Sequence, residues 1–334
     1  MSDRILMAHG SGGKLAHDLV EKGFLHSLSN PLLDRLDDSA VFDLSGRLAF
    51  TTDSYVVNPI FFRGGDIGRL AVCGTVNDLS MTGAVPLYLS LAFIVEEGLP
   101  RDDLMKVVDS VRQAASEAGV EVVTGDTKVV ERGSADKLFV NTAGVGVIPG
   151  GVEISGSRAR PGDRVIVSGT IGDHGIAILS QREGLSFSTD LKSDCAPLNK
   201  LVAAMIGVSP EIRCLRDPTR GGLATTLNEL AAQSGVSIRI EEETVPVREE
   251  VRAACEMLGL DPLYVANEGK LVAVVAAEDA EGVLDAMRRS LYGRDAAIIG
   301  EVRQEKPGRV VMKTGLGSSR IVDMLVGDPL PRIC

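Results

Sequence analysis

Hydrophobic and polar positions along this chain follow two different periods, and these predict alternating helices and strands. Pro86–Glu97 is densely apolar and predicts a buried strand. Arg101–Ala118 instead repeats its apolar residues every three or four positions and stops at Gly119, as a helix does. The first half of the chain therefore predicts a mixed α/β unit. Its expected helices are Leu15–Lys22, Ile67–Met81 and Arg101–Ala118, and its expected strands are Leu48–Thr52, Pro86–Glu97, Glu121–Val123 and Leu138–Ile148.

The alternation resumes after a stretch rich in Gly and Pro, residues 149–162, which we predict to separate two domains. The expected strands beyond it are Arg164–Val167, Val236–Ile240, Leu271–Ala276, Ala296–Val302 and Arg309–Lys313. The expected helices are Ile176–Gln181, Leu198–Ile206, Gly221–Gln233, Arg248–Leu258 and Ala280–Leu291. The sequence thus predicts one domain over residues 1–150, a second over 151–322 and a tail over 323–334.

Composition agrees with this division and narrows the range of functions. A chain of 334 residues exceeds one ordinary core, so two domains are expected. A net charge of −11 argues against a nucleic acid or an anionic membrane as partner. No apolar run approaches a membrane span, and the N-terminus lacks the apolar core of a signal peptide. The five cysteines have no paired spacing, so we expect reduced thiols and a cytoplasmic protein.

The tail ends on a cysteine, and chain ends are poorly ordered unless something holds them. Pro329 and Pro331 exclude a helix there, and at roughly 3.3 Å per residue the arm from Gly327 to Cys334 could cross a domain face. A terminal thiol on such an arm could carry a covalent group between sites. Taken alone, the tail favours the simpler interpretation, a frayed end with an incidental cysteine.

Acidic residues gather in four short clusters of the first half, which we expect at the ends of strands or the beginnings of turns. The clusters are Asp37–Ala40, Thr51–Ser54, Val76–Leu79 and Thr124–Lys128. Carboxylates mixed with hydroxyls and one lysine could hold Mg²⁺ and the phosphates of a nucleotide. Asp is also common at caps and turns, so each cluster by itself could be structural.

Three further segments could bind an anion or carry chemistry. His9–Lys14 is a glycine loop before a helix, which can present backbone N–H groups to phosphate, although its spacing is not that of a Walker A loop. Arg216–Leu223 opens a helix that Asp217 or Thr219 could cap, and Arg220 lies near the positive helix end, which suggests a bound anion. Asn267–Lys270 precedes a buried strand and by itself indicates only a turn.

Together these segments resemble the superfamily of aminoimidazole ribonucleotide synthetase, selenophosphate synthetase and thiamine-monophosphate kinase. The resemblance rests on Asp38, Asp53, Asn77-Asp78 and Thr124-Gly125-Asp126, followed by the run from Asp217 to Ala224. Within that superfamily, the His-Gly-Ser-Gly-Gly start and the Pro-Arg-Ile-Cys end are similar to the carbamoyl dehydratases of hydrogenase maturation, the HypE family. The similarity extends from His9 to Cys334.

The resemblance implies an α/β (α+β) fold with two domains, in which the N-terminal domain pairs with that of a second copy into a β-barrel. It implies ATP-dependent dehydration of a carbamoyl group on the terminal cysteine to a thiocyanate, whose cyanide goes to the iron of a nickel–iron hydrogenase. ATP and Mg²⁺ are the implied cofactors. The implied partners are a second copy, a carbamoyltransferase of the HypF family and an iron scaffold of the HypC and HypD families.

The family's roles can be placed on residues of this chain. The resemblance implies that Cys334 is the carrier, that Lys128 stabilises the transferred phosphoryl group, and that Glu268, or else His9, accepts a proton. The residues implied to bind the nucleotide are Gly10, Gly12, Gly13, Asp38, Asp53, Asn77, Asp78, Gly125, Asp126, Thr127, Asp217 and Arg220. The implied magnesium ligands are Asp38, Asp53, Asp78 and Asp126.

Two other functions remain open from the sequence. The chain could be another ATP-dependent member of the superfamily, although a selenophosphate synthetase would need Cys or selenocysteine in the glycine loop, and a kinase gives no role to a terminal cysteine. It could also be a non-catalytic cysteine carrier that binds nucleotide as a switch, which predicts no nucleotide turnover.

Overall fold

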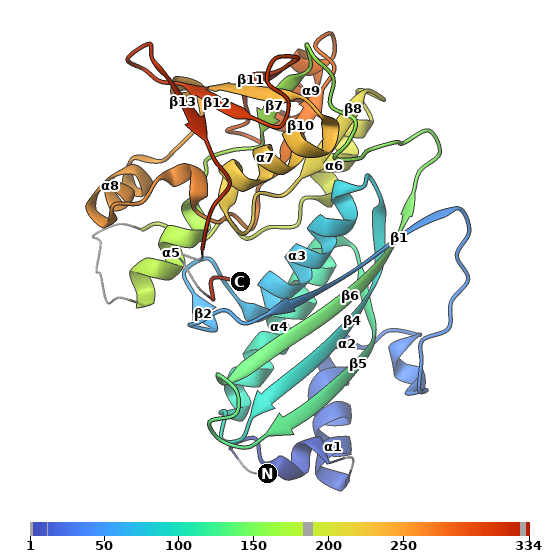
Figure 1. Ribbon diagram of the computed structural model, residues 1–334. Helices are drawn as coiled ribbons and strands as arrows, with labels where there is room; N and C mark the ends of the chain where they lie inside the picture. The colour runs from blue at the N-terminus through green and yellow to red at the C-terminus, as the bar shows by residue number, and fades with distance from the viewer. Residues whose placement is uncertain (1–2, 12, 183–189, 328–331) are drawn as a thin grey trace.

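The computed structural model describes residues 3–11, 13–182, 190–327 and 332–334, and it contains two main β-sheets, one from each half of the chain (Figure 1). The first sheet has the order β1-β6-β4-β5, in which β4 runs parallel to β5 and the other neighbours are antiparallel. Its strands are β1 (Arg47–Tyr55), β4 (Val85–Glu96), β5 (Glu121–Val130) and β6 (Leu138–Ile148). A small hairpin precedes the first long helix and consists of β2 (Phe61–Phe62) and β3 (Gly65–Asp66).

Helices α3 (Ile67–Met81) and α4 (Arg101–Ala118) cover one face of this sheet (Figure 1). The Asp66 side chain caps α3 by accepting hydrogen bonds from the backbone N–H groups of its first turn. Gly119 ends α4 in a left-handed conformation, with φ of 78°. Over the opposite face lies no helix of the described part of the chain, and Phe50 there is 71% exposed.

The N-terminal segment packs beside β5 as a series of short helical turns (Figure 1). Gly10 allows its close approach, since a Cβ there would lie 2.5 Å from the Val129 backbone nitrogen. The turns are η1 (Met7–Gly10), α1 (Lys14–Leu19), η2 (Val20–Phe24), α2 (Leu25–Leu28) and η3 (Leu33–Arg35).

The second sheet has seven strands in the order β13-β12-β9-β11-β7-β10-β8. Its core has α7 on one face and α6 with α9 on the other, so the central strands are buried on both sides. The strands are β7 (Arg164–Val167), β8 (Ile212–Arg216), β9 (Ser237–Glu241), β10 (Val272–Val275), β11 (Ala297–Arg303), β12 (Val310–Lys313) and β13 (Ser319–Val322). The helices are α5 (Asp173–Arg182), α6 (Asn199–Ile206), α7 (Gly222–Ser234), η4 (Glu242–Thr244), α8 (Glu249–Leu258), η5 (Pro262–Tyr264) and α9 (Ala280–Arg289).

The mixed α/β architecture agrees with the prediction, but two acidic clusters do not lie where the sequence placed them. Asn77 and Asp78 lie inside α3, and Thr124–Lys128 continues β5 instead of forming a turn, so neither cluster marks a strand end. The prediction that Asp217 or Thr219 caps α7 is also wrong, because Gly221 occupies that position without a side-chain cap. Within the described part of the chain, no helix has the length and apolarity to cross a membrane.

Candidate active site

The last three residues lie between the two sheets, beside α5 and β2 (Figure 1). The backbone N–H of Val56 donates to the Cys334 carbonyl at 3.2 Å, and the N–H of Asn58 donates to the Arg332 carbonyl at 3.3 Å. The Ile333 side chain is 3% exposed and belongs to the core of the first domain. The end of the tail is therefore docked along residues 56–58, whereas Pro329 and Pro331 lie outside the described residues.

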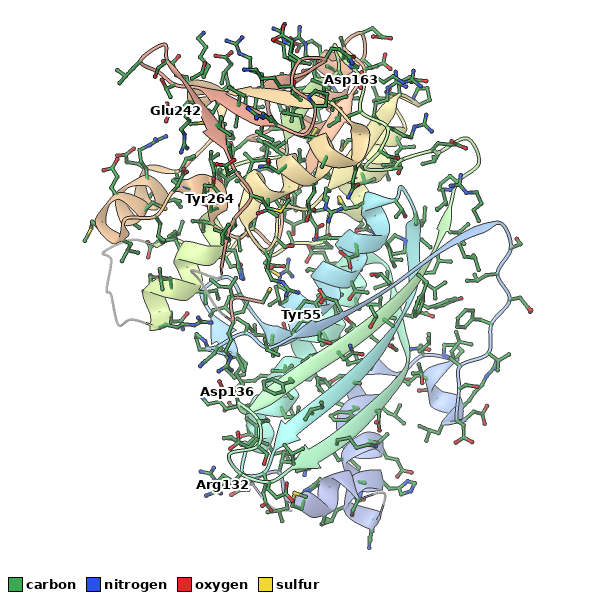
Figure 2. All side chains as sticks on the ribbon, in the orientation of Figure 1. Tyr55, Arg132, Asp136, Asp163, Glu242 and Tyr264 are labelled. Atoms are coloured by element: carbon green, nitrogen blue, oxygen red, sulfur yellow. The ribbon has the colours of Figure 1, made fainter. Side chains whose placement is uncertain are left out.

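Arg332 connects the docked tail to the first domain. Its guanidinium forms an ion pair with Asp136, which lies on the turn between β5 and β6 and is labelled in Figure 2. Its backbone has φ of 57°, a left-handed conformation that costs a non-glycine residue roughly 1–2 kcal/mol. The Arg182 side chain at the end of α5 donates to the Arg332 carbonyl. Docking therefore depends on contacts from both halves of the chain.

A buried carboxylate, Glu268, lies at the same junction. Its backbone carbonyl accepts a hydrogen bond from the Asn77 amide of α3 at 3.3 Å, and its side chain is buried. One carboxylate oxygen, Oε1, has no hydrogen-bond partner among the described residues. An unpaired buried carboxylate is costly, which is the signature of a group kept for chemistry or for a ligand.

Other acids surround Glu268 and share its electrostatic environment. Burial and the charge of Asp217 raise the pKa of Glu268 well above its ordinary value. Burial, followed by the charge of Asp78, raises the pKa of Asp217 to about 7. Burial and the charge of Asp53 also raise the pKa of Asp78, although the Thr51 hydroxyl donates to that carboxylate at 2.9 Å. These four acids are short of positive charge, which a cation would supply.

Tyr55, labelled in Figure 2, ends β1 directly before the tail-binding residues. It is fully buried, and burial with the nearby Asp53 charge raises the pKa of its phenol well above the ordinary value. Its hydroxyl lies 3.5 Å from the Thr75 hydroxyl on α3. Tyr55 thus stays uncharged near the acids, and it directly precedes Val56, whose backbone binds the tail.

A second group of predicted residues lines a cavity of about 390 Å³ between the N-terminal turns and β5. His9 and Gly10 lie on one side, and Thr124–Lys128 lies on the other. Apolar residues from α1, η2, α2 and β4 form the rest of the wall. The His9 Nδ1 atom accepts a hydrogen bond from the Leu6 backbone N–H at 3.0 Å, which fixes the ring against the loop.

Asp126 and Lys128 form an ion pair at 2.9 Å on β5. The prediction that both project to one face of a strand is consistent with their register opposite Ala92 and Ile94 of β4. Ile94 is 43% exposed, so this is the face without helices. Glu268 lies on the α3 side, and a single chain therefore does not bring Lys128 to the carboxylate that the sequence grouped with it.

The same division applies to the four aspartates predicted to bind magnesium. Asp53 lies near Asp78 on the α3 side of the sheet, whereas Asp126 is on the other face and Asp38 is exposed on the loop before β1. Among the residues described here, no three Asp, Glu, His or Cys side chains gather in the manner of a metal site. Gly13 begins α1, Arg220 is exposed before α7, and Gly12 lies outside the described residues.

Three residues that hold the tail carry no signal in the sequence, namely His174, Arg182 and Asp136. His174 Nε2 lies 2.9 Å from the Ile333 carbonyl. These residues come from helix α5 and a β-turn, each far from the tail along the chain. Isolated charged or imidazole side chains in such places are usually structural, and only the fold brings them together.

The residues present fit a nucleotide and a divalent cation. The cavity combines an apolar wall for a flat ring system with a glycine turn and the Lys128 ammonium for phosphates. The acids around Glu268 provide hard oxygen atoms, one of them unpaired, of the kind that Mg²⁺ prefers. The cavity lies at the β5 edge of the first sheet, whereas the acids lie around α3 and the second domain.

Comparison with known proteins identifies relatives over almost the whole chain. Residues 36–148 match the family model for the AIR synthase related protein, N-terminal domain, and residues 160–313 match the model for its C-terminal domain. The chain is 59% identical over 329 residues to a protein of Azotobacter vinelandii named carbamoyl dehydratase HypE, covering 98% of this chain and 96% of that relative.

Solved structures give the same relationship. The chain superposes with a TM-score of 0.96 on hydrogenase maturation protein HypE in complex with ATP, at 54% identity, covering 98% of this chain and 99% of that one. It also matches a chain of a HypE–HypF complex with a TM-score of 0.82 at 52% identity, covering 92% and 99%. The similarity therefore extends through both sheets.

Proposed function

The chain belongs to the carbamoyl dehydratase HypE family, and we propose that it uses ATP to dehydrate a carbamoyl group carried on its own Cys334 to a thiocyanate. The main support is the docked tail, whose terminal residue binds the Val56 backbone at the junction that also contains the buried, partly unpaired Glu268. The cyanide would then pass to the iron of a nickel–iron hydrogenase during its maturation.

The chemistry explains why a base and a phosphoryl donor are both needed. The carbamoyl oxygen is a poor leaving group, and phosphoryl transfer from ATP converts it into phosphate, which leaves with that oxygen. The carbamoyl nitrogen loses both of its protons as the C–N triple bond forms. Glu268 is the proposed acceptor, because its raised pKa makes it a stronger base than an ordinary carboxylate.

ATP and magnesium fit the remaining predicted residues. We assign the nucleotide to the cavity lined by His9, Gly10 and Thr124–Lys128. Asp53 and Asp78 would hold Mg²⁺, which neutralises charge on the triphosphate, and Asp38 and Asp126 would join them from a second copy, since they lie apart from them in one chain. Asp217 and Arg220 would contact the nucleotide from the second domain.

A homodimer forms part of the proposal, because the first sheet has one face without helices and two edge strands in the described part of the chain. Phe50 on that face is 71% exposed and Leu48 is 51% exposed, and among the described strands β1 and β5 each have a partner on one side alone. A second copy would cover both features by closing a β-barrel. Since Lys128 and Glu268 lie on opposite sides of the sheet in one chain, a dimer also allows Lys128 of one copy to act on the tail of the other.

The partners follow from the substrate. A carbamoyltransferase of the HypF family would load Cys334, as suggested by the HypE–HypF complex among the matching structures. An iron scaffold of the HypC and HypD families would receive the cyano group. All of these steps would take place in the cytoplasm.

The decisive experiment is mass spectrometry of the C-terminal peptide after the protein is incubated with carbamoyl phosphate, ATP, Mg²⁺ and the transferase. A carbamoyl adduct on Cys334 should appear and convert to the cyano form when ATP is present. Cys334→Ala should fold and bind ATP but carry neither group. Either adduct on another cysteine of that variant would contradict the assignment.

Mixed dimers test whether Lys128 acts on the other copy. A dimer of one Lys128→Ala subunit and one Cys334→Ala subunit keeps one intact lysine and one intact tail, on different chains. If Lys128 acts across the dimer, this species forms thiocyanate at the rate of a single active site, whereas the Lys128→Ala homodimer does not. An inactive mixed dimer would place Lys128 and the tail that it serves in the same chain.

A further inference from the structure

Helix α5 contacts the docked tail through its first turn and through its last residue. At its start, His174 Nε2 lies 2.9 Å from the Ile333 carbonyl oxygen. At its end, the Arg182 side chain donates to the Arg332 carbonyl. Both groups bind main-chain oxygens, so they recognise the position of the tail and not the identity of its side chains.

The partners of His174 determine which nitrogen carries its proton. A carbonyl oxygen can only accept, so Nε2 must be the protonated nitrogen that donates to Ile333. The other nitrogen, Nδ1, lies 2.8 Å from the Ser193 hydroxyl. That hydroxyl accepts from the Cys195 backbone N–H at 3.1 Å, which leaves its own proton to donate to Nδ1. The neutral Nε2–H form therefore satisfies every group in this chain of bonds.

The surroundings of His174 favour that neutral form. The side chain is fully buried and meets the edge of the Phe62 ring, with ring centroids 5.7 Å apart. Burial lowers the pKa of His174, an effect that the nearby Asp194 carboxylate opposes and the Arg182 charge reinforces. A neutral imidazole keeps Nδ1 as an acceptor for Ser193.

The same short segment also holds the catalytic carboxylate. Asp194, next to Ser193, accepts a hydrogen bond from the Glu268 backbone N–H at 3.0 Å through Oδ1. Its Oδ2 atom forms an ion pair with Lys270 at 3.2 Å, and the Asp194 side chain is only 2% exposed. The backbone of residues 193–195 thus links the bonds that hold the tail to the bond that holds Glu268.

We propose that His174 is a positioning residue that fixes the docked tail through the Ile333 carbonyl, and that Ser193 and Asp194 align this contact with Glu268. The proposal rests on the function given above, since it concerns where the carbamoylated Cys334 lies when it reacts. His174 differs from a satisfied core histidine in one respect. One of its two hydrogen-bond partners belongs to the segment that leaves the site for loading.

Two polar variants separate the two sides of the imidazole. His174→Gln keeps an amide N–H₂ group at about the reach of Nε2, so it can still donate to Ile333. His174→Asn is shorter and keeps only a group near Nδ1, so it loses the tail contact. His174→Leu removes both contacts, and His26→Leu, on an exposed surface of α2, is the control.

The first readout is independent of catalysis. The full-length dimer is treated with a thiol-alkylating reagent, and the C-terminal peptide is followed by mass spectrometry, because Cys334 is the only cysteine that is not buried. Loss of one hydrogen bond to a buried carbonyl should increase Cys334 alkylation about tenfold in His174→Asn and His174→Leu. His174→Gln and His26→Leu should remain close to the wild-type rate.

The second readout is single-turnover dehydration by pre-carbamoylated protein. His174→Asn should lower the rate of thiocyanate formation about tenfold with unchanged ATP affinity, and His174→Gln should restore it. Equal alkylation rates in the Asn and Gln variants, with both folded, would overturn the proposal. If wild-type protein forms no thiocyanate but the alkylation rates still differ, the proposed function fails and the tail contact stands.

Discussion

Ile333 offers a direct measure of how firmly the tail is docked. Its side chain is 3% exposed and packs into the core of the first domain, yet it belongs to a segment that must leave during the proposed cycle. Truncating this side chain should weaken docking without weakening the fold, because most of the remaining core residues come from α3, α4 and the first sheet.

The magnitude follows from the carbon atoms removed. Ile333→Ala removes three buried carbons, and at about 0.8 kcal/mol for each the docked state should lose about 2.4 kcal/mol. That change corresponds to an increase of about 60-fold in the ratio of undocked to docked tail. Ile333→Val removes one carbon, so its loss of about 0.8 kcal/mol should change the ratio only about fourfold.

The assay is Cys334 alkylation under conditions in which the tail opens and closes faster than the reagent reacts, so that the rate reports the undocked population. We expect Cys334 alkylation to be fastest in Ile333→Ala, slower in Ile333→Val and slowest in the wild type. The thermal unfolding temperature should be the same in all three within error. Leu316→Ala is the matched control, since Leu316 is 98% exposed on the β12–β13 turn. A wild-type alkylation rate in Ile333→Ala would refute the inference that this side chain holds the tail.

Three further predictions concern the proposed site. Glu268 has a raised pKa, so its ionisation costs folding free energy; the cost is absent below the unfolded pKa, grows as pH rises from the unfolded to the folded pKa, and is constant above the folded one. Glu268→Gln should therefore raise the Tm, by a margin that increases with pH, while dehydration slows roughly 10²–10⁴-fold; a lower Tm at neutral pH would contradict this. Asp78→Asn should weaken Mg²⁺-dependent ATP binding by at least about 1–3 kcal/mol in calorimetry, and unchanged affinity would remove Asp78 from the site. Phe50→Glu should yield monomers in sedimentation, and a persistent dimer would place the interface elsewhere.

The two long helices of the first domain could be placed to the residue from the sequence. Both α3 and α4 begin and end where expected, at Ile67–Met81 and Arg101–Ala118. Their apolar periodicity is supported by local signals, an Asp before the first and a Gly after the second, which act through the backbone of the same turn. Local signals of this kind do not depend on the rest of the fold.

β5 was predicted too short because its sequence lacks the usual alternation. Val122 and Val123 are both buried, since the register with β4 shifts there, and the polar run Thr124–Lys128 follows. As an edge strand with one uncovered face, β5 can carry Gly and Asp without burying them. β8 and β13 were missed because they are short edge strands of the second sheet. The domain limits at residues 150 and 322 stay predictions.

For the candidate site, the sequence predicted suitable residue types but not where these residues lie relative to one another. The sequence singled out Cys334, Glu268 and the Asp126–Lys128 pair because their residue types suit phosphoryl transfer. It did not indicate that Lys128 and Glu268 lie on opposite sides of a sheet, since that depends on the pairing of distant strands. Nor did it indicate His174, because a single histidine at the start of a helix has no pattern.

The contacts of the tail suggest why it can both dock and leave. Ile333 and the His174 bond favour the docked state, but the Arg332–Asp136 ion pair has both side chains a third or more exposed and contributes little. The left-handed backbone at Arg332 opposes docking by roughly 1–2 kcal/mol. A carrier that must alternate between two enzymes needs states of comparable free energy, because a tail held several kcal/mol too firmly would rarely reach the transferase. The strained arginine next to a buried isoleucine is an arrangement that keeps the two states close.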